Sequence, residues 1–106
     1  VALCHQEGRI DIAEVATTTV RMKADRAQVY ERYLASEESL GKAGAYAIQG
    51  VGGDLVEGID GDYTTVVGLP LRLVARLLSS IGYPIPINVE ELYQHKPYGN
   101  WSRFAV

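Results

Sequence analysis

The sequence is organised around the stretch Gly41-Lys42-Ala43-Gly44-Ala45-Tyr46-Ala47-Ile48-Gln49-Gly50. This stretch places one lysine and one glutamine seven positions apart, with a glycine at each end. Glycine lets a backbone approach a ligand closely, and a loop that opens into a helix offers unpaired N–H groups to an anion. The stretch therefore predicts a phosphate-binding loop, with the plain close packing of small residues as the alternative interpretation.

The length and composition are those of one folded domain. The chain has 106 residues, of which 47% are hydrophobic and 22% are charged. A chain of this length can bury about two thirds of the surface that its unfolded form exposes. We therefore expect a single domain with a real core.

The charge pattern argues against nucleic acid and membrane partners. The net charge is −3, and the ten Lys and Arg residues form no basic cluster. No apolar run approaches the roughly 20 residues that span a bilayer, and no signal pattern is present. Cys4 is the only cysteine, so neither an internal disulfide nor a cysteine-based metal site can form. These features favour a cytoplasmic protein.

The N-terminal segment predicts strands. Residues 1–5 are apolar, residues 6–8 supply a turn, and residues 9–12 alternate polar with apolar, as in a hairpin. Val15 breaks the alternation, which predicts a bulge near Ala13-Glu14 or a strand covered on both sides. The β-branched residues 17–20 predict a further strand. Because the chain opens on Val1 inside a strand pattern, we expect a fragment or a processed chain.

A helix is predicted from Arg26 to about Leu34. Asp25 is its expected N-cap, and Gln28 has the spacing of a capping box. Its inner face should consist of the apolar and aromatic side chains of Val29, Tyr30, Tyr33 and Leu34. The two tyrosine hydroxyls should lie at the edge of the core. The following residues, Ser36-Glu37-Glu38-Ser39, read as a solvated loop. The alternative is that their carboxylates hold a divalent metal beside a phosphate.

The central third is rich in turns, because eight glycines lie between Gly41 and Gly68. Asp60-Gly61 is flanked by residues 54–59 and 63–67, and this pattern predicts a β-hairpin with a type I′ turn.

The remaining residues predict one long helix and an irregular tail. Pro70 suits the first turn of a helix whose apolar residues recur at helical spacing up to Gly82. Beyond it, Pro84 and Pro86 exclude a helix, residues 88–93 predict one short helical turn, and residues 95–99 look irregular. His5 and His95 have no partner at ligand spacing, so we expect surface histidines rather than catalysts.

Two separated motifs carry a family resemblance. They are residues 36–50, Ser-Glu-Glu-Ser-Leu-Gly-Lys-Ala-Gly-Ala-Tyr-Ala-Ile-Gln-Gly, and residues 61–71, Gly-Asp-Tyr-Thr-Thr-Val-Val-Gly-Leu-Pro-Leu. In this order they resemble the Maf family of nucleoside triphosphate pyrophosphatases, also called septum formation proteins. The resemblance covers about residues 1–81. We therefore divide the chain into residues 1–82, the C-terminal part of a Maf-like domain, and residues 83–106, a tail without a family counterpart.

The resemblance implies an α/β fold with an elongated mixed sheet flanked by helices and split by a cleft. It also implies Mg²⁺ or Mn²⁺ as cofactor and hydrolysis of a nucleoside triphosphate to the monophosphate and pyrophosphate. By position, Lys42 corresponds to a lysine near the triphosphate, Gln49 to the glutamine associated with choice of base, and Glu38 to an acidic position before the lysine. The run Ala-Tyr-Ala-Ile-Gln-Gly resembles the branch that acts on dTTP and UTP rather than the 7-methyl-GTP branch.

The chain also departs from the family. Where the family has Gly, Glu and Pro before the lysine, this chain has Glu37-Glu38-Ser39. The family's Ser-x-Ser-Pro-Arg phosphate loop, its second lysine and its water-activating aspartate do not occur in these residues. A triphosphate needs a metal or several preorganised cations, and this stretch supplies only Lys42 beside two carboxylates. We therefore expect no catalytic residue within this chain.

Two functions remain open from the sequence. The first is a Maf-type pyrophosphatase whose catalytic base lies outside these residues. The second is a non-catalytic remnant of the family that binds nucleotide or pairs with another copy. Strands left with open edges favour a homodimer.

Overall fold

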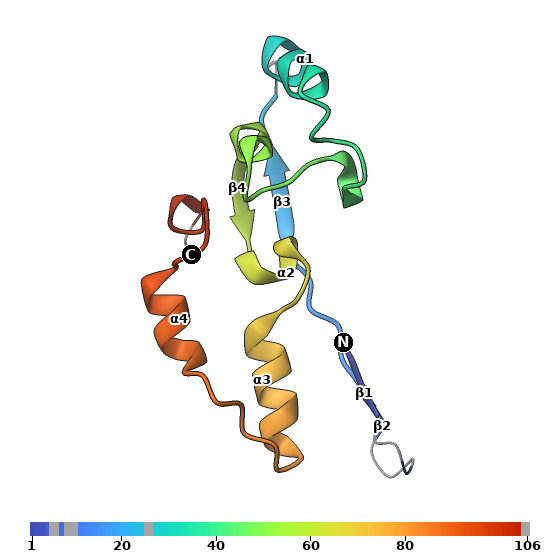
Figure 1. The fold of residues 1–106 in the computed structure, drawn as a ribbon, viewed down its shortest axis with the longest axis vertical. Coiled ribbons are helices and arrows are strands. Elements are labelled where there is room, and N and C mark those ends of the chain that lie inside the picture. Colours follow the sequence, from blue (N-terminus) through green and yellow to red (C-terminus); the bar gives the residue numbers. More distant parts are fainter. Residues whose placement is uncertain (5–6, 8–10, 25–26, 105–106) are drawn as a thin grey trace.

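The computed structural model describes residues 1–4, 7, 11–24 and 27–104, and it shows an elongated molecule (Figure 1). Its principal extents are 52 × 29 × 20 Å, and its radius of gyration is 16.5 Å. A compact domain of about 100 residues has a radius of gyration of about 13 Å. The chain therefore exposes more surface than a compact domain of its length.

The N-terminal hairpin is confirmed. Strand β1 (Ala2–Cys4) pairs antiparallel with β2 (Asp11–Ala13), with Leu3 opposite Ile12. Most of the expected turn lies outside the described residues. The predicted irregularity at Ala13-Glu14 is wrong, because the pairing of β1 and β2 has no register shift and β2 ends at Ala13. Val15, with 90% of its surface exposed, lies beyond the strand rather than between two covering layers.

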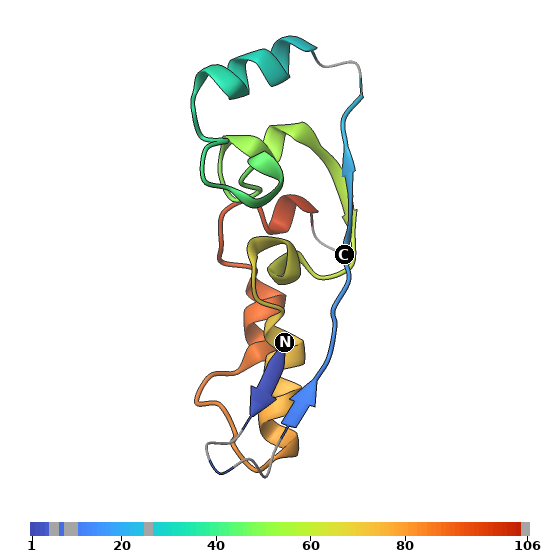
Figure 2. The ribbon, with the colours of Figure 1, turned by 90° about the vertical axis from the view of Figure 1, so that its right-hand side faces the viewer.

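The centre of the molecule is a second antiparallel pair. Strand β3 (Thr19–Met22) pairs with β4 (Val56–Asp60), with Val20 opposite Ile59 and a register shift between Arg21 and Met22 (Figures 1 and 2). The strand expected at residues 17–20 therefore forms two residues later. Its partner comes from far along the chain.

The hairpin predicted around Asp60-Gly61 is wrong. The residues after the turn form helix α2 (Tyr63–Val67) instead of a second strand. The physical reason is Asp62, whose Oδ1 atom accepts a hydrogen bond of 2.8 Å from the N–H of Thr64 and so caps the helix. Thr18 holds this junction to β3, because its Oγ1 atom accepts a hydrogen bond of 3.0 Å from the N–H of Asp62.

Helix α1 (Ala27–Ala35) agrees with the predicted helix to within a residue at each end, and the expected cap at Asp25 lies outside the described residues. Tyr33 is buried, and Val29 and Tyr30 are half-buried, as expected for an inner face. The placement of Leu34 on that face is wrong, because 60% of its surface is exposed. Among the described elements, α1 packs mainly on residues 51–55.

The predicted long helix is confirmed as α3 (Leu71–Ser80). The chain turns away from the helix axis at Gly82, two residues after α3 ends, with a φ of 87° that is accessible mainly to glycine, and the N–H of Tyr83 donates to the carbonyl of Leu78 at 2.9 Å. The tail is more regular than expected. Helix α4 (Val89–His95) replaces the single short turn, with Asn88 as its N-cap. It runs beside α3 in both ribbon views (Figures 1 and 2).

The hydrophobic core joins the tail to the centre of the molecule. Its buried residues are Ile48, Val56, Ile59, Tyr63, Trp101 and Phe104. Trp101 stacks on Tyr63 at a centroid distance of 5.6 Å and on Tyr98 at 5.9 Å, and it meets Tyr93 edge-on at 5.0 Å. Trp101 and Phe104 thus fill the core from a segment for which the sequence predicts no helix or strand.

The fold class is α/β, as expected. Strand pairing among the described residues is confined to two small antiparallel sheets, each of two strands, flanked by helices. No helix in the described part of the chain is long and apolar enough to cross a membrane.

Candidate functional site

The two sequence motifs meet in one small pocket. Lys42, Ala43 and residues 46–49 form one side of it, and Val66 and Val67 of α2 form the other. The pocket volume is about 200 Å³. Lys42 and Gln49, which the sequence predicts as phosphate and base contacts, therefore line the same hollow. Lys42 is the only charged residue among these lining residues.

The backbone of this stretch is a series of tight turns rather than a loop leading into a long helix. A 3₁₀ turn at Ala43–Ala45 follows Lys42, and Gly41 and Gly44 have φ values of 73° and 69°. Three residues of 3₁₀ structure do not offer the row of N–H groups that a full helix presents to an anion. The expectation of a helix N-terminus here is therefore wrong, and a phosphate contact at this site rests on the Lys42 side chain.

Contacts with the core and with neighbouring backbone hold residues 46–50 in place. Ile48 is buried in the core, and the N–H of Ala47 donates a hydrogen bond of 3.1 Å to the hydroxyl of Tyr33. A Cβ atom on Gly52 would lie 2.7 Å from the carbonyl oxygen of Ala47. The backbone at Ala47 and the backbone at position 52 thus approach so closely that position 52 requires glycine. This contact fixes the backbone around Gln49, which follows the buried Ile48.

Glu38 does not line the pocket that holds Lys42 and Gln49. Its Oε1 atom accepts a hydrogen bond of 3.2 Å from the N–H of Gly52. Glu38 therefore contributes to the site as a support of the backbone that follows Gln49. The notion that residues 36–39 form a metal site finds no support in the geometry, because no group of three or more His, Cys, Asp or Glu side chains in the described residues could hold a metal ion.

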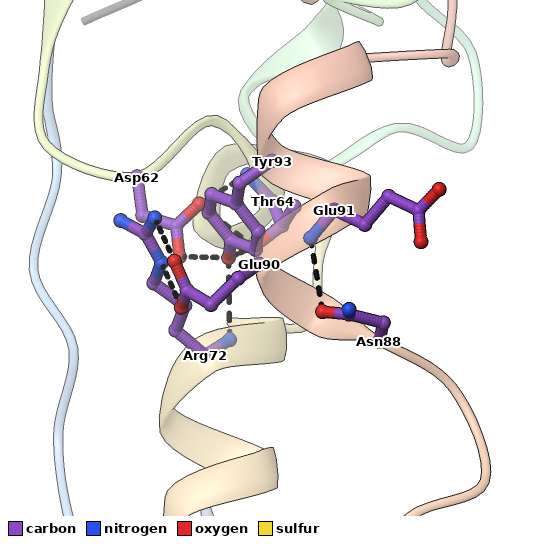
Figure 3. Close-up of polar contacts among 7 residues, drawn as sticks. All are labelled: Asp62, Thr64, Arg72, Asn88, Glu90, Glu91 and Tyr93. Atoms are coloured by element: carbon purple, nitrogen blue, oxygen red, sulfur yellow. Dashed lines mark hydrogen bonds and ion pairs between the residues drawn. The ribbon is translucent and has the colours of Figure 1, made fainter.

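A polar cluster that the sequence analysis did not predict lies beside α2 (Figure 3). The hydroxyl of Tyr93, from α4, donates a hydrogen bond of 2.6 Å to Oδ2 of Asp62 and accepts one of 3.2 Å from the N–H of Arg72. Thr64 donates through Oγ1 to Oδ1 of Asp62 at 2.8 Å. Arg72 lies over the Tyr93 ring and bonds both carboxylate oxygens of Glu90. The cluster ties the second motif to the tail.

Burial sets the ionisation of the tyrosines around these motifs. Burial raises the pKa of Tyr93, and the hydrogen bond to the Asp62 carboxylate raises that pKa further. The pKa values of Tyr46, in the pocket wall, and of Tyr63, in the core, are also raised by burial. These hydroxyls therefore stay protonated at neutral pH and act as neutral hydrogen-bonding groups.

Larger hollows lie elsewhere. A groove of about 820 Å³ runs between residues 14–18, α3 and residues 84–90, and a hollow of about 370 Å³ adjoins Tyr93 and Trp101. Neither contains Lys42 or Gln49. We place the candidate site at the smaller pocket because it joins residues from both motifs and includes Lys42.

The sequence does not predict the role of two residues close to the site. Tyr93 and Asn100 lie in the tail, 44 and 51 positions after Gln49. The only sequence signal for Tyr93 is its position on the apolar side of a short helix, and Asn100 has none. Their contacts arise from the folding of the tail back onto the centre of the chain.

Comparison with known proteins gives the family. The sequence model of the family described as "Maf-like protein" matches residues 1–81. The chain belongs to this family, as its two motifs indicate. The tail from residue 82 lies beyond the matched residues.

The curated relatives are named consistently. A protein of Bordetella parapertussis named dTTP/UTP pyrophosphatase is 51% identical over 86 residues, which cover 81% of this chain and 41% of that protein. Proteins of the same name from Syntrophotalea carbinolica and Dictyoglomus thermophilum are 44% and 45% identical, over 68% and 70% of this chain. These alignments cover 33% and 38% of those two proteins. The chain thus spans about two fifths of the length of the relatives it matches.

Proposed function

We propose that this chain supplies part of a nucleoside triphosphate pyrophosphatase that acts on dTTP, UTP or modified nucleotides. The reaction adds water to a triphosphate and releases the monophosphate and pyrophosphate. The observation that carries the proposal is the pocket in which Lys42 and Gln49 meet α2, because it brings both family motifs to one place. The names of the relatives support the reaction and the substrates.

Lys42 and Gln49 have separate tasks in this proposal. The ammonium group of Lys42 is a compact point charge that attracts a phosphate group of the nucleotide. The Gln49 carboxamide carries both a donor and an acceptor, so it can pair with the edge of uracil or thymine, which alternates carbonyl and N–H groups. The pocket is smaller than the range of about 300–1,000 Å³ typical of small-molecule sites. It therefore accommodates part of a nucleotide and forms one wall of a larger cleft.

The group that activates water lies outside this chain in our proposal. A triphosphate carries several negative charges, and Lys42 alone does not balance them. The resemblance implies Mg²⁺ or Mn²⁺, which such enzymes use with substrate phosphates. The described residues do not fit a metal site on their own. No step that we assign to this chain passes through the metal.

We further propose a cytoplasmic location, where nucleoside triphosphates are made and consumed, and a homodimer. The open edges of the two small sheets and exposed apolar residues such as Leu40 favour association with a second copy. Light scattering during size-exclusion chromatography measures the mass directly. A mass of one chain at all concentrations would contradict the dimer.

Pyrophosphate release tests the proposed reaction. A family-length protein that contains residues 1–106 should release pyrophosphate from dTTP or UTP in the presence of Mg²⁺. The 106-residue chain alone should bind the same nucleotides without releasing pyrophosphate. No release from any nucleoside triphosphate by the longer protein would contradict the proposal. Saturable binding without release would then favour a non-catalytic binding module, and no binding would favour a structural remnant.

A further inference from the structure

The tail is hydrogen-bonded to the candidate site through the side chain of Asn100. The Nδ2 atom of Asn100 donates one hydrogen bond of 2.8 Å to the carbonyl of Ile48 and another of 3.0 Å to the carbonyl of Gly50. These two carbonyls belong to the residues that precede and follow Gln49. Because a carbonyl oxygen can only accept, the amide nitrogen and not the amide oxygen must face them. Both N–H bonds of the Asn100 amide are thereby used to hold the backbone around Gln49.

The space for this contact is provided by the neighbouring backbone. A Cβ atom on Gly53 would lie 2.6 Å from Nδ2 of Asn100 and 2.8 Å from the carbonyl oxygen of Ile48. Any larger residue at position 53 would therefore displace the amide. A Cβ atom on Gly99 would approach the carbonyl oxygen of Gln49 to 3.2 Å. The tail backbone and the Gln49 segment are thus in close contact as well as hydrogen-bonded.

The Asn100 side chain is itself fixed in place. Its backbone is in the left-handed region, with φ of 68°, which asparagine adopts more readily than most residues. On one side, the hydroxyl of Tyr63 donates a hydrogen bond to the carbonyl of Gly99. On the other side, Trp101 is buried in the core and stacked on Tyr63. The amide therefore extends from a rigid support toward the Gln49 segment.

We propose that Asn100 is a positioning residue that sets the base preference of the site through Gln49. The inference rests on the proposed function and extends it to a residue outside the part of the chain that matches the family. The direction of the Gln49 side chain follows from the peptide planes on both of its sides. Asn100 holds the preceding plane through the Ile48 carbonyl, and it holds the chain one residue after Gln49 through the Gly50 carbonyl. The plane between Gln49 and Gly50 is held by the N–H of Gly50, which donates to the carbonyl of Ala47 at 3.1 Å. Small displacements of a group that reads a ligand edge weaken recognition strongly. The tail thus acts on base recognition without touching the nucleotide.

The test uses two substitutions that remove the donor but tolerate the left-handed backbone. Asn100→Gly deletes the amide, and glycine favours this backbone conformation. Asn100→Asp keeps the shape but places a carboxylate oxygen against two carbonyl oxygens. Asn88→Asp is the matched control, because it makes the same change of charge in the same tail. Asn88 acts through its Oδ1 atom, which accepts from the N–H of Glu91, and aspartate preserves that acceptor.

The first measurement is hydrogen exchange of the amides in residues 46–53 of the full 106-residue chain, without nucleotide. The amides of Gly50 and Gly53 donate to the carbonyls of Ala47 and Gly50, so their exchange reports the order of this segment. We expect exchange to become about tenfold faster in both Asn100 variants, the factor for the loss of one or two hydrogen bonds. Asn88→Asp should leave it unchanged. Unchanged exchange in Asn100→Gly and Asn100→Asp would overturn the positioning role.

The second measurement is the ratio of the dissociation constants for UTP and CTP, which differ in the hydrogen-bonding edge of the base. We expect both Asn100 variants to bring this ratio about tenfold closer to one, while the affinity for inorganic pyrophosphate stays within about twofold. An unchanged ratio together with faster exchange would overturn the link to base preference. A wild-type chain that binds neither nucleotide would contradict the proposed function and this link together. The exchange experiment would still decide whether Asn100 orders the segment.

Discussion

The Tyr93 hydroxyl lies 2.6 Å from Oδ2 of Asp62 and donates a hydrogen bond to it, joining a helix of the tail to the first turn of α2 (Figure 3). Asp62 uses its other carboxylate oxygen to cap α2. One side chain thus starts the helix that carries Val66 and Val67 into the candidate pocket and also anchors the tail. The position of α2 depends on both contacts.

Removal of the Tyr93 hydroxyl should destabilise the chain. Tyr93→Phe leaves the ring in place but removes the donor to Asp62 and the acceptor of the Arg72 N–H. We expect the free energy of unfolding to fall by about 1–3 kcal/mol, because the part-buried carboxylate of Asp62 loses a hydrogen-bond donor. Urea denaturation measures this loss. Tyr83→Phe is the control, because Tyr83 is exposed, and it should change stability by at most about 0.5 kcal/mol. Equal effects of the two changes would show that the Tyr93 contacts add nothing.

Truncation of Trp101 tests whether the tail belongs to the core. Only 3% of the Trp101 surface is exposed, and three tyrosine rings surround it. Trp101→Ala should lower the free energy of unfolding by about 3–5 kcal/mol, as for other large buried aromatic residues. Ile87→Ala changes an exposed apolar residue of the same tail and should have little effect. A Trp101→Ala chain as stable as Ile87→Ala would place the tail outside the core.

Stability should fall at alkaline pH. The pKa values of Tyr46, Tyr63 and Tyr93 are raised above 10.0, in each case mainly by burial. The unfolded chain therefore loses these protons at a lower pH than the folded chain, so the folded chain binds more protons in this range. The stabilisation from these groups is complete below about pH 10 and is lost as the pH rises through the folded pKa values. Urea unfolding at a series of pH values between about 8 and 11 measures the decline. A constant free energy of unfolding over this range would contradict it.

The role of Glu38 separates backbone support from ligand binding. Glu38→Gln keeps an oxygen acceptor for the N–H of Gly52, whereas Glu38→Ala removes it. If Glu38 only supports the segment after Gln49, Glu38→Gln should bind UTP within about twofold of the wild type, and Glu38→Ala should speed the exchange of the Gly52 amide by about tenfold. Isothermal titration and hydrogen exchange provide the two values. A large loss of Mg²⁺-dependent binding in Glu38→Gln would instead assign the carboxylate to the substrate or its metal.

Local patterns in the sequence predict some elements well. The pairing of β1 with β2 and the whole of α3 depend on contacts between residues close in sequence, such as the stop at Gly82. The hairpin at Asp60-Gly61 fails because a second local signal, the cap at Asp62, starts a helix where the strand was expected. Asp60-Gly61 signals a hairpin and Asp62 signals the start of a helix, so local sequence does not decide between a strand and a helix after Gly61. In the structure β4 pairs with the distant strand β3 instead of with the residues that follow it.

Some residues of the candidate site can be identified from the sequence, and others only from the fold. The family resemblance identifies Lys42 and Gln49 as candidate binding residues, and in the fold both line one pocket. Part of the support of that pocket comes from Asn100, Tyr93 and Trp101, which follow Gln49 by more than 40 positions. Such contacts depend on the return path of the tail, and periodicity and spacing carry no information about that path.

The most direct test of the central claim, that this pocket holds the phosphate of a nucleotide through Lys42, is a titration of UTP into a matched pair of variants. Lys42→Met and Lys23→Met each remove one ammonium group and keep most of the aliphatic stem, but only Lys42 lines the pocket. We predict that Lys42→Met weakens UTP binding by about tenfold or more, as expected for the loss of a charged hydrogen bond, and that Lys23→Met stays within about twofold of the wild type. Equal affinities of wild type and Lys42→Met, or a wild-type chain that binds no nucleotide, would contradict the claim.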